Sequence, residues 1–228
     1  MSYTRRTLLL GGIASITSLA LSEVAGAISP DINHGSRSSE KVALTFHGAG
    51  DPSIASALLK IFQETSTPVT VFAVGTFLKA NPNFAKEIVD AGHDLGNHTM
   101  THTQMKTISA KLVDQEVSQC AELLNKLIGN HGSFFRPSGT QFSTAIIRKS
   151  AKKFGYQNCI SYDVDSKDYL DPGKDAVISN VAKAAKGGSI ISLHFGHKNT
   201  VAAMPLIIEN LNRKGLKPVT LTELLGSI

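Results

Sequence analysis

Short apolar segments alternate with segments of helical periodicity along most of this chain, and this alternation limits its possible folds more than any other feature. The apolar segments are rich in β-branched and aromatic residues and are bounded by Gly, Pro or Asn, as buried parallel strands are. They cover residues 42–46, 69–75, 93–97, 133–136, 158–164, 189–195 and 217–222. A strand followed by a helix, repeated about seven times, requires parallel pairing with right-handed crossovers, so the sequence predicts an α/β fold, either a closed barrel or an open doubly wound sheet.

The segments between these strands have the apolar spacing of amphipathic helices, and each follows a residue that can cap a helix. They cover residues 53–64, 82–91, 109–128, 143–154, 175–186 and 201–214. Glycines at 92, 129, 155, 187 and 215 come just after helices, where a left-handed residue commonly ends the last turn. No Gly-x-Gly-x-x-Gly follows the first strand, so the main signal of a dinucleotide-binding fold is missing.

The composition is that of one folded domain. The chain has 228 residues, 42% of them hydrophobic and 18% charged, which is too apolar for intrinsic disorder. The formal net charge of +5 is scattered over the predicted helices, and no basic run is interleaved with aromatic residues. We therefore expect no nucleic-acid partner.

Residues 1–27 have the features of an export signal. Arg5 and Arg6 precede a moderately apolar run, and Ala25-Gly26-Ala27 has the small-x-small pattern of a cleavage site. These features predict a twin-arginine signal peptide, read by the twin-arginine export machinery and then removed. The mature protein is accordingly expected to be exported, to the periplasm, the cell wall or the medium, without stable insertion in a membrane.

Residues 28–40 are polar and turn-forming, with no period, and they predict a linker between the cleavage site and a single catalytic domain at 41–228. In an oxidising compartment Cys120 and Cys159 could form a disulfide. Two buried thiols, one in a helix and one in a strand, are the alternative.

Histidines and acidic residues follow several predicted strands, at the edge where the chemistry of α/β folds collects. These strand-end residues are His47, Asp51, His98, His102, Arg136, Asp163, Asp165, Asp168, His194 and His197. The spacing of His98 and His102 equals one helical turn, so both rings can face one ion. Nitrogen ligands with a carboxylate suit Zn²⁺ best, with Co²⁺, Mn²⁺ or Ni²⁺ as alternatives, and two histidines leave positions for a third ligand and a water.

Five short motifs occur in a characteristic order: LTF at 44–46, HTMTH at 98–102, FFRP at 134–137, DSKDY at 165–169 and SLH at 192–194. This series resembles that of the polysaccharide deacetylases, the NodB-homology domain of carbohydrate esterase family four. The resemblance runs from about Val42 to the C-terminus and implies a distorted (β/α)₇ barrel in a single domain. It also implies an enzyme that removes acetyl groups from N-acetylglucosamine or acetylated xylan with an aspartate, two histidines and one metal ion.

The resemblance also implies roles for single residues. His98 and His102 match the histidine ligands, and Arg136 matches the arginine that orients the catalytic base. The loop that follows Arg136 would offer the backbone N–H of residue 139 to the oxyanion. Asp168 matches the carboxylate that pairs with the catalytic histidine, and His194 matches the general acid.

The first motif departs from the family pattern. Residues 45–52 read TFHGAGDP where the family has TFDDGP, so His47 takes the position of the base and Gly48 that of the ligand. Asp51 could return to the ion through the flexible glycines, and we predict Asp51 as a ligand and His47 as the base. Alternatively, Asp51 caps the helix that begins at Pro52, and His47 is the third ligand of a three-histidine site.

The sequence thus predicts an exported metal-dependent deacetylase acting on N-acetyl or O-acetyl groups of a glycan such as chitin oligomers, peptidoglycan or xylan. A glycan-binding protein that has lost catalysis is one alternative, although Arg136, Asp168 and His194 together argue for retained chemistry. An amidohydrolase of a small cyclic or linear amide is another, because the chain has no tryptophan to build a long sugar groove.

Overall fold

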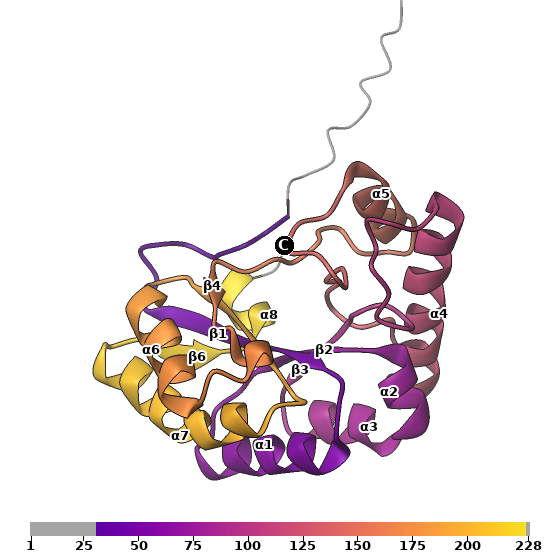
Figure 1. Ribbon diagram of the computed structural model, residues 1–228. Helices are drawn as coiled ribbons and strands as arrows, with labels where there is room; N and C mark the ends of the chain where they lie inside the picture. Colours follow the sequence, from indigo (N-terminus) through magenta and orange to yellow (C-terminus); the bar gives the residue numbers. More distant parts are fainter. Residues whose placement is uncertain (1–30, 227–228) are drawn as a thin grey trace, which may run out of the picture.

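The structure, a computed structural model, describes residues 31–226. A parallel sheet of six strands lies at its centre, in the order β3-β2-β1-β5-β4, with β6 also paired to β1 (Figure 1). The strands are β1 (Lys41–Gly48), β2 (Thr70–Ala73), β3 (Asp94–Asn97), β4 (Val164–Asp165), β5 (Ile190–His194) and β6 (Lys217–Val219). The prediction of a single α/β domain with parallel strands is confirmed. The predicted signal peptide at residues 1–27 lies outside the described residues.

The longest strand, β1, is the axis of the sheet. Its first residues pair with β6, its last residues pair with β2 along the same edge, and its other edge pairs with β5. This register places His47 directly beside His194 of β5. The carboxyl ends of the central strands therefore meet at the edge of the sheet where the candidate site was predicted.

The barrel is distorted because two of its predicted strands are hardly formed. Residues 133–136 and 158–164 contribute isolated bridges, Asn97 to Phe135 and Phe135 to Cys159, and then the short β4. Pro137 has no N–H to continue the ladder, and the carbonyl of Arg136 lies 2.9 Å from a ring nitrogen of His98 instead. These segments continue the curve of the sheet without closing it.

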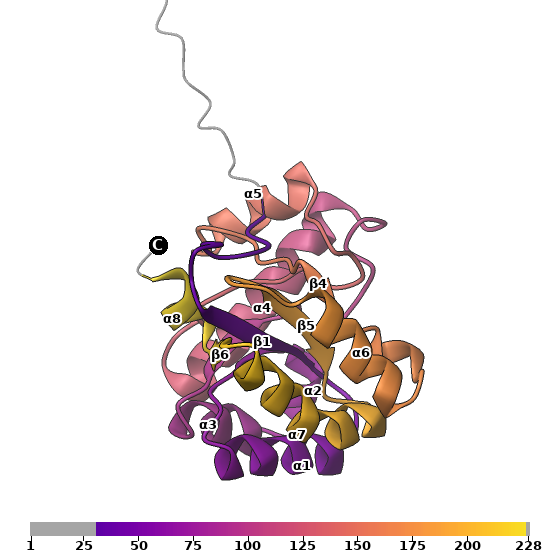
Figure 2. The same cartoon turned by 90° about the vertical axis from the view of Figure 1, so that its left-hand side faces the viewer.

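Most helices lie on the outer side of the sheet, as Figure 2 shows, and the last one, near the C-terminus, packs on the other face. The helices are α1 (Pro52–Glu64), α2 (Gly75–Ala80), α3 (Asn83–Asp90), α4 (Ala110–Ile128), α5 (Ala145–Lys153), α6 (Lys174–Ala184), α7 (Lys198–Arg213) and α8 (Leu221–Leu225). The sequence did not predict α2 or α8, which lie at the ends of predicted strands and are too short to show a helical period. Of the glycines expected to be left-handed, Gly187 is not; its neighbour Gly188 has a φ of 75°.

Residues 31–40 are part of the folded domain and not the predicted linker. The N–H of Ile32 donates to the carbonyl of Cys159 at 2.9 Å, and the N–H of Ser161 donates to the carbonyl of Ile32 at 2.7 Å. Arg37 forms an ion pair with Asp163 at 2.9 Å. Residues 159–161 have no regular strand on this side, and the segment supplies the hydrogen-bond partners that their backbone would otherwise lack.

Both cysteines are free and buried, so the predicted alternative of two unpaired thiols is confirmed. Burial raises the pKa of the Cys120 thiol to about 12 and that of Cys159 to about 11. Thiols with such pKa values are protonated at neutral pH and unreactive. Cys120 lies in the main core, where Phe46 packs between Phe62 and Phe195, and Cys159 lies in a second apolar cluster.

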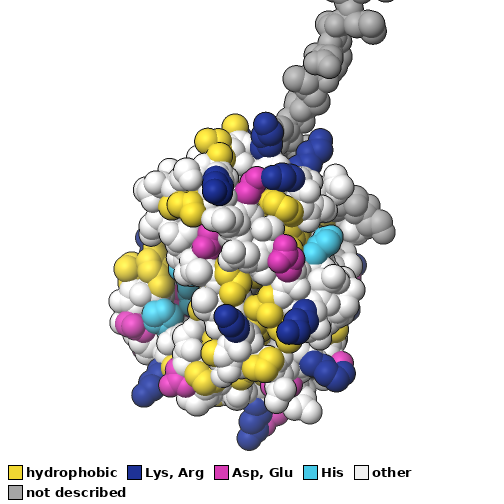
Figure 3. Space-filling model, turned by 90° about the vertical axis from the view of Figure 1, so that its right-hand side faces the viewer, with side chains coloured by type: hydrophobic (Ala, Val, Ile, Leu, Met, Phe, Trp, Pro, Cys, Tyr) yellow, Lys and Arg dark blue, Asp and Glu magenta, His cyan; other side chains and the backbone are white. Residues whose placement is uncertain are grey.

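The surface shows no extended patch of one charge on the face drawn in Figure 3, where basic and acidic side chains are interspersed. Among the described residues, no helix is long and apolar enough to cross a membrane.

Candidate metal centre and active site

Three histidines lie together at the carboxyl ends of β1 and β3. His47, His98 and His102 each offer a ring nitrogen, and these nitrogens all lie within 4.8 Å of one another. Nδ1 of His47 is 2.8 Å from Nε2 of His98, and the ring centroids of His98 and His102 are 5.0 Å apart. This is the group that the described part of the chain offers to a metal ion.

The segment 98–102 brings its two rings together without forming the expected helical turn. Thr99 and His102 have φ angles of 69° and 59°, in the left-handed region, and the segment is a loop. The side chain of Asn97 accepts the N–H of Thr99 at 2.8 Å, and Glu116 of α4 accepts the N–H of Thr101 at 2.8 Å. The prediction that both histidines face one side is confirmed, but a tight loop produces the arrangement.

The protonation of His98 follows from its neighbours. Its Nδ1 lies 2.9 Å from the carbonyl oxygen of Arg136. A carbonyl only accepts, so Nδ1 carries the proton and Nε2 presents a lone pair. The facing Nδ1 of His47 donates to that lone pair, because two lone pairs at 2.8 Å would repel.

Burial keeps these imidazoles neutral. It lowers the pKa of His47 and His98 well below the usual histidine value. Repulsion between neighbouring rings in their charged forms lowers the pKa further, above all from His98 for His47 and from His102 for His98. The pKa of His102 is also lowered by burial and by His194. Neutral imidazoles are the form that binds metal ions, and three of them match the ligand set of a catalytic zinc site. The residues present therefore fit a divalent cation.

The structure does not bring Asp51 to these histidines. Its carboxylate is the N-cap of α1 and accepts the N–H of Ser53 at 2.8 Å and the hydroxyl of Ser53 at 2.7 Å. Gly50 has a φ of 106° and packs closely on Gly196. A Cβ on residue 50 would lie only 2.6 Å from the Cα of Gly196. The loop therefore crosses the end of β5 instead of folding back toward His98, and the cap alternative describes the place of Asp51.

Gly48, at the position of the family's ligand aspartate, has no room for a side chain. A Cβ at this residue would lie 2.8 Å from Cγ1 of Val71 and 3.1 Å from Cα of Ala73. The strand β1 thus approaches β2 more closely than any other residue type allows. Of the two motif positions, only residue 47 can present a side chain to the site.

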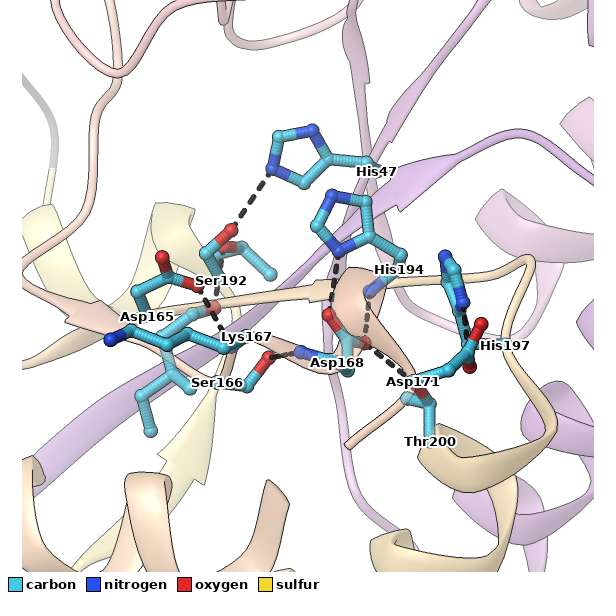
Figure 4. A network of polar contacts seen from close by, with 12 residues as sticks. His47, Asp165, Ser166, Lys167, Asp168, Asp171, Ser192, His194, His197 and Thr200 are labelled. Carbon is cyan, nitrogen blue, oxygen red and sulfur yellow. Dashed lines mark hydrogen bonds and ion pairs between the residues drawn. The ribbon is translucent and has the colours of Figure 1, made fainter. Parts of the chain in front are cut away.

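His194 and Asp168 form a dyad next to His47 (Figure 4). Nδ1 of His194 is 2.7 Å from Oδ1 of Asp168. The hydroxyl of Thr200 donates to Oδ2 of Asp168 at 2.6 Å. Although burial raises the pKa of Asp168, the hydrogen bonds from His194 and Thr200 outweigh it and hold the pKa below its usual value. Asp168 is therefore ionised, and it fixes a proton on Nδ1 of His194.

The ring of His194 stacks on that of His47, with centroids 4.3 Å apart. A second histidine–carboxylate pair is drawn in Figure 4, with Nδ1 of His197 3.0 Å from Oδ1 of Asp171. Neither residue is part of the pocket lining. His197 is therefore not among the groups that face the three histidines.

Arg136 lies fully buried behind His47. Its guanidinium donates to the carbonyls of Ile160 at 3.2 Å and Ser161 at 3.0 Å, and Nη1 is 3.5 Å from Nε2 of His47. In the described part of the chain no carboxylate forms an ion pair with it. Burial lowers its pKa to about 9, so the guanidinium is charged at neutral pH. Arg136 thus contacts His47, the residue at the position of the family's base.

These groups open into a pocket of about 410 Å³, within the range of small-molecule sites. The lining residues are His47, His102, Gln104, Pro137, Gly139, Thr140, Gln141, Tyr162, Tyr169 and His194. The lining contains no carboxylate, and Tyr169 on its rim is 46% exposed.

Comparison with known proteins decides the family. A family model described as "Polysaccharide deacetylase" matches residues 34–159. The chain belongs to the polysaccharide deacetylase family. The matched range includes the first motif, with its altered residues, and the HTMTH segment. It begins at His34, in the segment before β1 that pairs with the sheet.

The relatives of this chain include named deacetylases. The chain is 32% identical over 188 residues to a peptidoglycan-N-acetylglucosamine deacetylase of Bacillus cereus, and the alignment covers 81% of this chain and 87% of the relative. It is 26% identical over 195 residues to a chitooligosaccharide deacetylase of Rhizobium leguminosarum bv. trifolii, covering 82% and 83%. Its structure is similar, with a TM-score of 0.79 and 28% identity, to a Bacillus anthracis pseudoenzyme of carbohydrate esterase family four, covering 85% of this chain and 68% of the other.

Two polar residues of this deacetylase-family site were not predicted. Ser192 contacts Nε2 of His47 at 3.0 Å, and Thr200 binds Asp168. Ser192 had a detectable signal, because it is a polar residue inside an apolar strand two positions before His194, and alternate residues of a strand share a face. Thr200 lies in the first turn of α7, and nothing in the sequence marked it.

Proposed function

We propose that this protein is a metal-dependent hydrolase that removes acetyl groups, N-acetyl foremost, from the sugar residues of a glycan such as peptidoglycan or chitin oligomers. One observation carries the proposal: His47, His102 and His194 line the same pocket, with the buried His98 in contact with His47 and the buried Asp168 in contact with His194. Two named deacetylases among the relatives support the substrate class. O-acetyl esters, as on xylan, are the second bond type that the same chemistry would cleave.

His47, His98 and His102 would hold the divalent cation, with zinc favoured by a ligand set of imidazoles. When bound, such a cation lowers the pKa of a water molecule and polarises the acetyl carbonyl. His47 thereby takes the role of third ligand that we first assigned to Asp51, because its ring nitrogen is within reach and the Asp51 carboxylate caps α1.

His194 would move the proton. The water oxygen bonds to the acetyl carbon while His194 Nε2 takes a proton from the water. The same proton then passes to the leaving nitrogen as the C–N bond breaks, which releases acetate and the free amine. Asp168 stabilises the charged imidazolium between the two transfers. Because the pocket lining contains no carboxylate, His194 serves as both base and acid.

Backbone and rim residues would complete the site. Gly139 lines the pocket, and its N–H is the donor that we assign to the developing oxyanion. The exposed ring of Tyr169, whose centroid is 5.4 Å from that of His194, offers an apolar face to a sugar. We also propose export through the twin-arginine machinery and cleavage after Ala27, which Arg5, Arg6 and the Ala25-Gly26-Ala27 pattern support.

A second candidate is a glycan-binding protein without turnover. The similarity to the Bacillus anthracis pseudoenzyme favours it, as does the loss of both aspartates from the first motif. Against it stands the dyad, since binding a sugar does not require a buried carboxylate that makes two hydrogen bonds to one histidine and is held by a third from Thr200.

The two candidates are separated by measuring acetate release from N-acetylglucosamine oligomers and from peptidoglycan, in the presence of zinc or cobalt and after chelation. We expect release that depends on the metal and is lost in His98→Ala. His197→Ala is the matched control, because this histidine is not part of the three-histidine group and pairs with Asp171 instead. Glycan binding with no acetate release under any metal would establish the binding protein and overturn the hydrolase.

A further inference from the structure

Ser192 is a buried hydroxyl on the inner face of β5, next to the candidate metal ligands. It is only 1% exposed and pairs in register with Thr45 of β1, two residues before His47. Its Oγ lies 3.0 Å from Nε2 of His47, the contact drawn in Figure 4. Among the side-chain hydrogen bonds of the described residues, this is the one that Oγ of Ser192 makes.

The two ring nitrogens of His47 have opposite requirements. As the rings lie, Nδ1 donates to His98 and Nε2 accepts, with the Ser192 hydroxyl as its donor. A ligand nitrogen must present a lone pair. For Nδ1 of His47 to bind a cation next to Nε2 of His98, the proton of the neutral ring has to be on Nε2.

A proton on Nε2 needs an acceptor, since an unpaired N–H in a buried site is unfavourable. The polar atoms near Nε2 are Oγ of Ser192 at 3.0 Å and Nη1 of Arg136 at 3.5 Å. A guanidinium only donates, whereas a hydroxyl can donate or accept. Ser192 is therefore the neighbour that can satisfy both tautomers of His47.

We propose that Ser192 is a positioning residue of the metal centre: its Oγ accepts the Nε2–H of His47 and so holds Nδ1 in the form that binds the cation. This inference rests on the proposed function, in which His47 is a ligand. Removing a hydrogen-bond partner of a ligand histidine typically lowers metal affinity by about 10- to 100-fold, and we expect a loss of that size for Ser192→Ala.

The test compares the zinc affinity of the full-length protein and its variants by competition with a chelator of known affinity. Ser192→Ala is expected to bind zinc about 10- to 100-fold more weakly, whereas Ser192→Thr, which keeps the hydroxyl, retains the affinity. Ser150→Ala is the matched control, a buried serine of α5 whose hydroxyl contacts none of the histidines. The absorption spectrum of bound Co²⁺ is expected to change in Ser192→Ala alone. A wild-type affinity in Ser192→Ala would overturn the role of Ser192 and leave the proposed metal centre intact.

A measurement on the unaltered protein keeps the inference testable if Ser192→Ala does not fold. Nitrogen NMR of labelled histidine distinguishes the two tautomers, and we expect His47 to change from the Nδ1–H to the Nε2–H form when zinc is added. A His47 that stays in the Nδ1–H form while zinc binds would overturn the inference. Absence of any zinc binding by the wild-type protein would overturn the proposed three-histidine centre, and the inference with it.

Discussion

The carboxylate of Asp168 binds His194 twice: Oδ1 lies 2.7 Å from Nδ1 of the ring, and Oδ2 accepts the backbone N–H at 2.8 Å. The side chain and the main chain of His194 are thus fixed by one group, on a strand end that faces the pocket. This geometry leaves Nε2 as the only ring nitrogen available to a substrate. It makes Asp168 the residue on which the orientation and the charge of His194 depend.

Asp168→Asn is expected to lower kcat for acetate release by about 100- to 10,000-fold, the range for losing a positioned acid–base group. An amide cannot stabilise the imidazolium, and it can favour the wrong tautomer of His194. Zinc content should be unchanged, because the metal-binding group consists of three histidines and does not include Asp168. A variant with full turnover would contradict the role of His194, and one that loses its metal would show that Asp168 acts on the ligands.

Thr200→Val removes the hydroxyl that donates to Asp168 at 2.6 Å and is expected to raise the pKa of that carboxyl. The pKa of Asp168 is lower in the folded protein than in the unfolded chain, where it is about 3.9. The ionised carboxylate therefore stabilises the fold above about pH 3.9, and this stabilisation is lost as the pH falls through the pKa of the folded state. The variant should lose about 1.5–3 kcal/mol of unfolding free energy at pH 7. Its acid unfolding midpoint should also move to higher pH. Urea unfolding at several pH values checks this, with Thr222→Val, an exposed threonine bonded to Asp94, as the control for a weaker pair.

The three histidines predict a separate pH dependence in metal-free protein. Their pKa values are lowered by burial, so the unfolded chain takes up protons at a higher pH than the folded one. Unfolding free energy is therefore expected to fall as pH decreases below about 6.5, by about 1.4 kcal/mol for each unit of downward shift. His47→Gln should flatten this dependence between pH 5 and 7. An equally steep profile in the variant would show that other groups cause the loss.

Asp51→Ala distinguishes a helix cap from a metal ligand. The carboxylate accepts two hydrogen bonds from Ser53 at the start of α1, so its loss is expected to lower the Tm slightly. Zinc affinity should be the same as in the wild type. Asp51→Asn, which keeps a capping side chain, should restore the Tm. A large loss of zinc affinity in either variant would return Asp51 to the metal site.

The sequence was sufficient for the parts of the fold that depend on periodicity. Alternating segments predicted the parallel sheet and most of the helices, and strand ends predicted where His47, His98 and His194 meet. It failed where long-range packing decides the local structure. The loop at 98–102 is shaped by bonds to Asn97 and Glu116, and neither bond follows from the spacing of the two histidines.

Packing also explains the other differences. Residues 31–40 look like a linker by composition, but their backbone pairs with residues 159–161 at the open part of the sheet. Whether Asp51 turns inward or caps α1 depends on the contact of Gly50 with Gly196, about 145 residues away along the chain. A single sequence contains both glycines but does not show that they touch.

Gly48→Asp, which restores an aspartate at the position where the family has its ligand, is expected to destabilise the protein without raising its zinc affinity. The obstacle is Cβ itself, which would lie 2.8 Å from Val71 and 3.1 Å from the backbone of Ala73, so Gly48→Ala should be destabilising as well. Overpacking of this kind typically costs about 1–3 kcal/mol. Urea unfolding and zinc competition on both variants test the expectation. Tighter zinc binding by Gly48→Asp would mean that β1 and β2 can separate at this point, and that His47 is the third ligand only because the aspartate is missing.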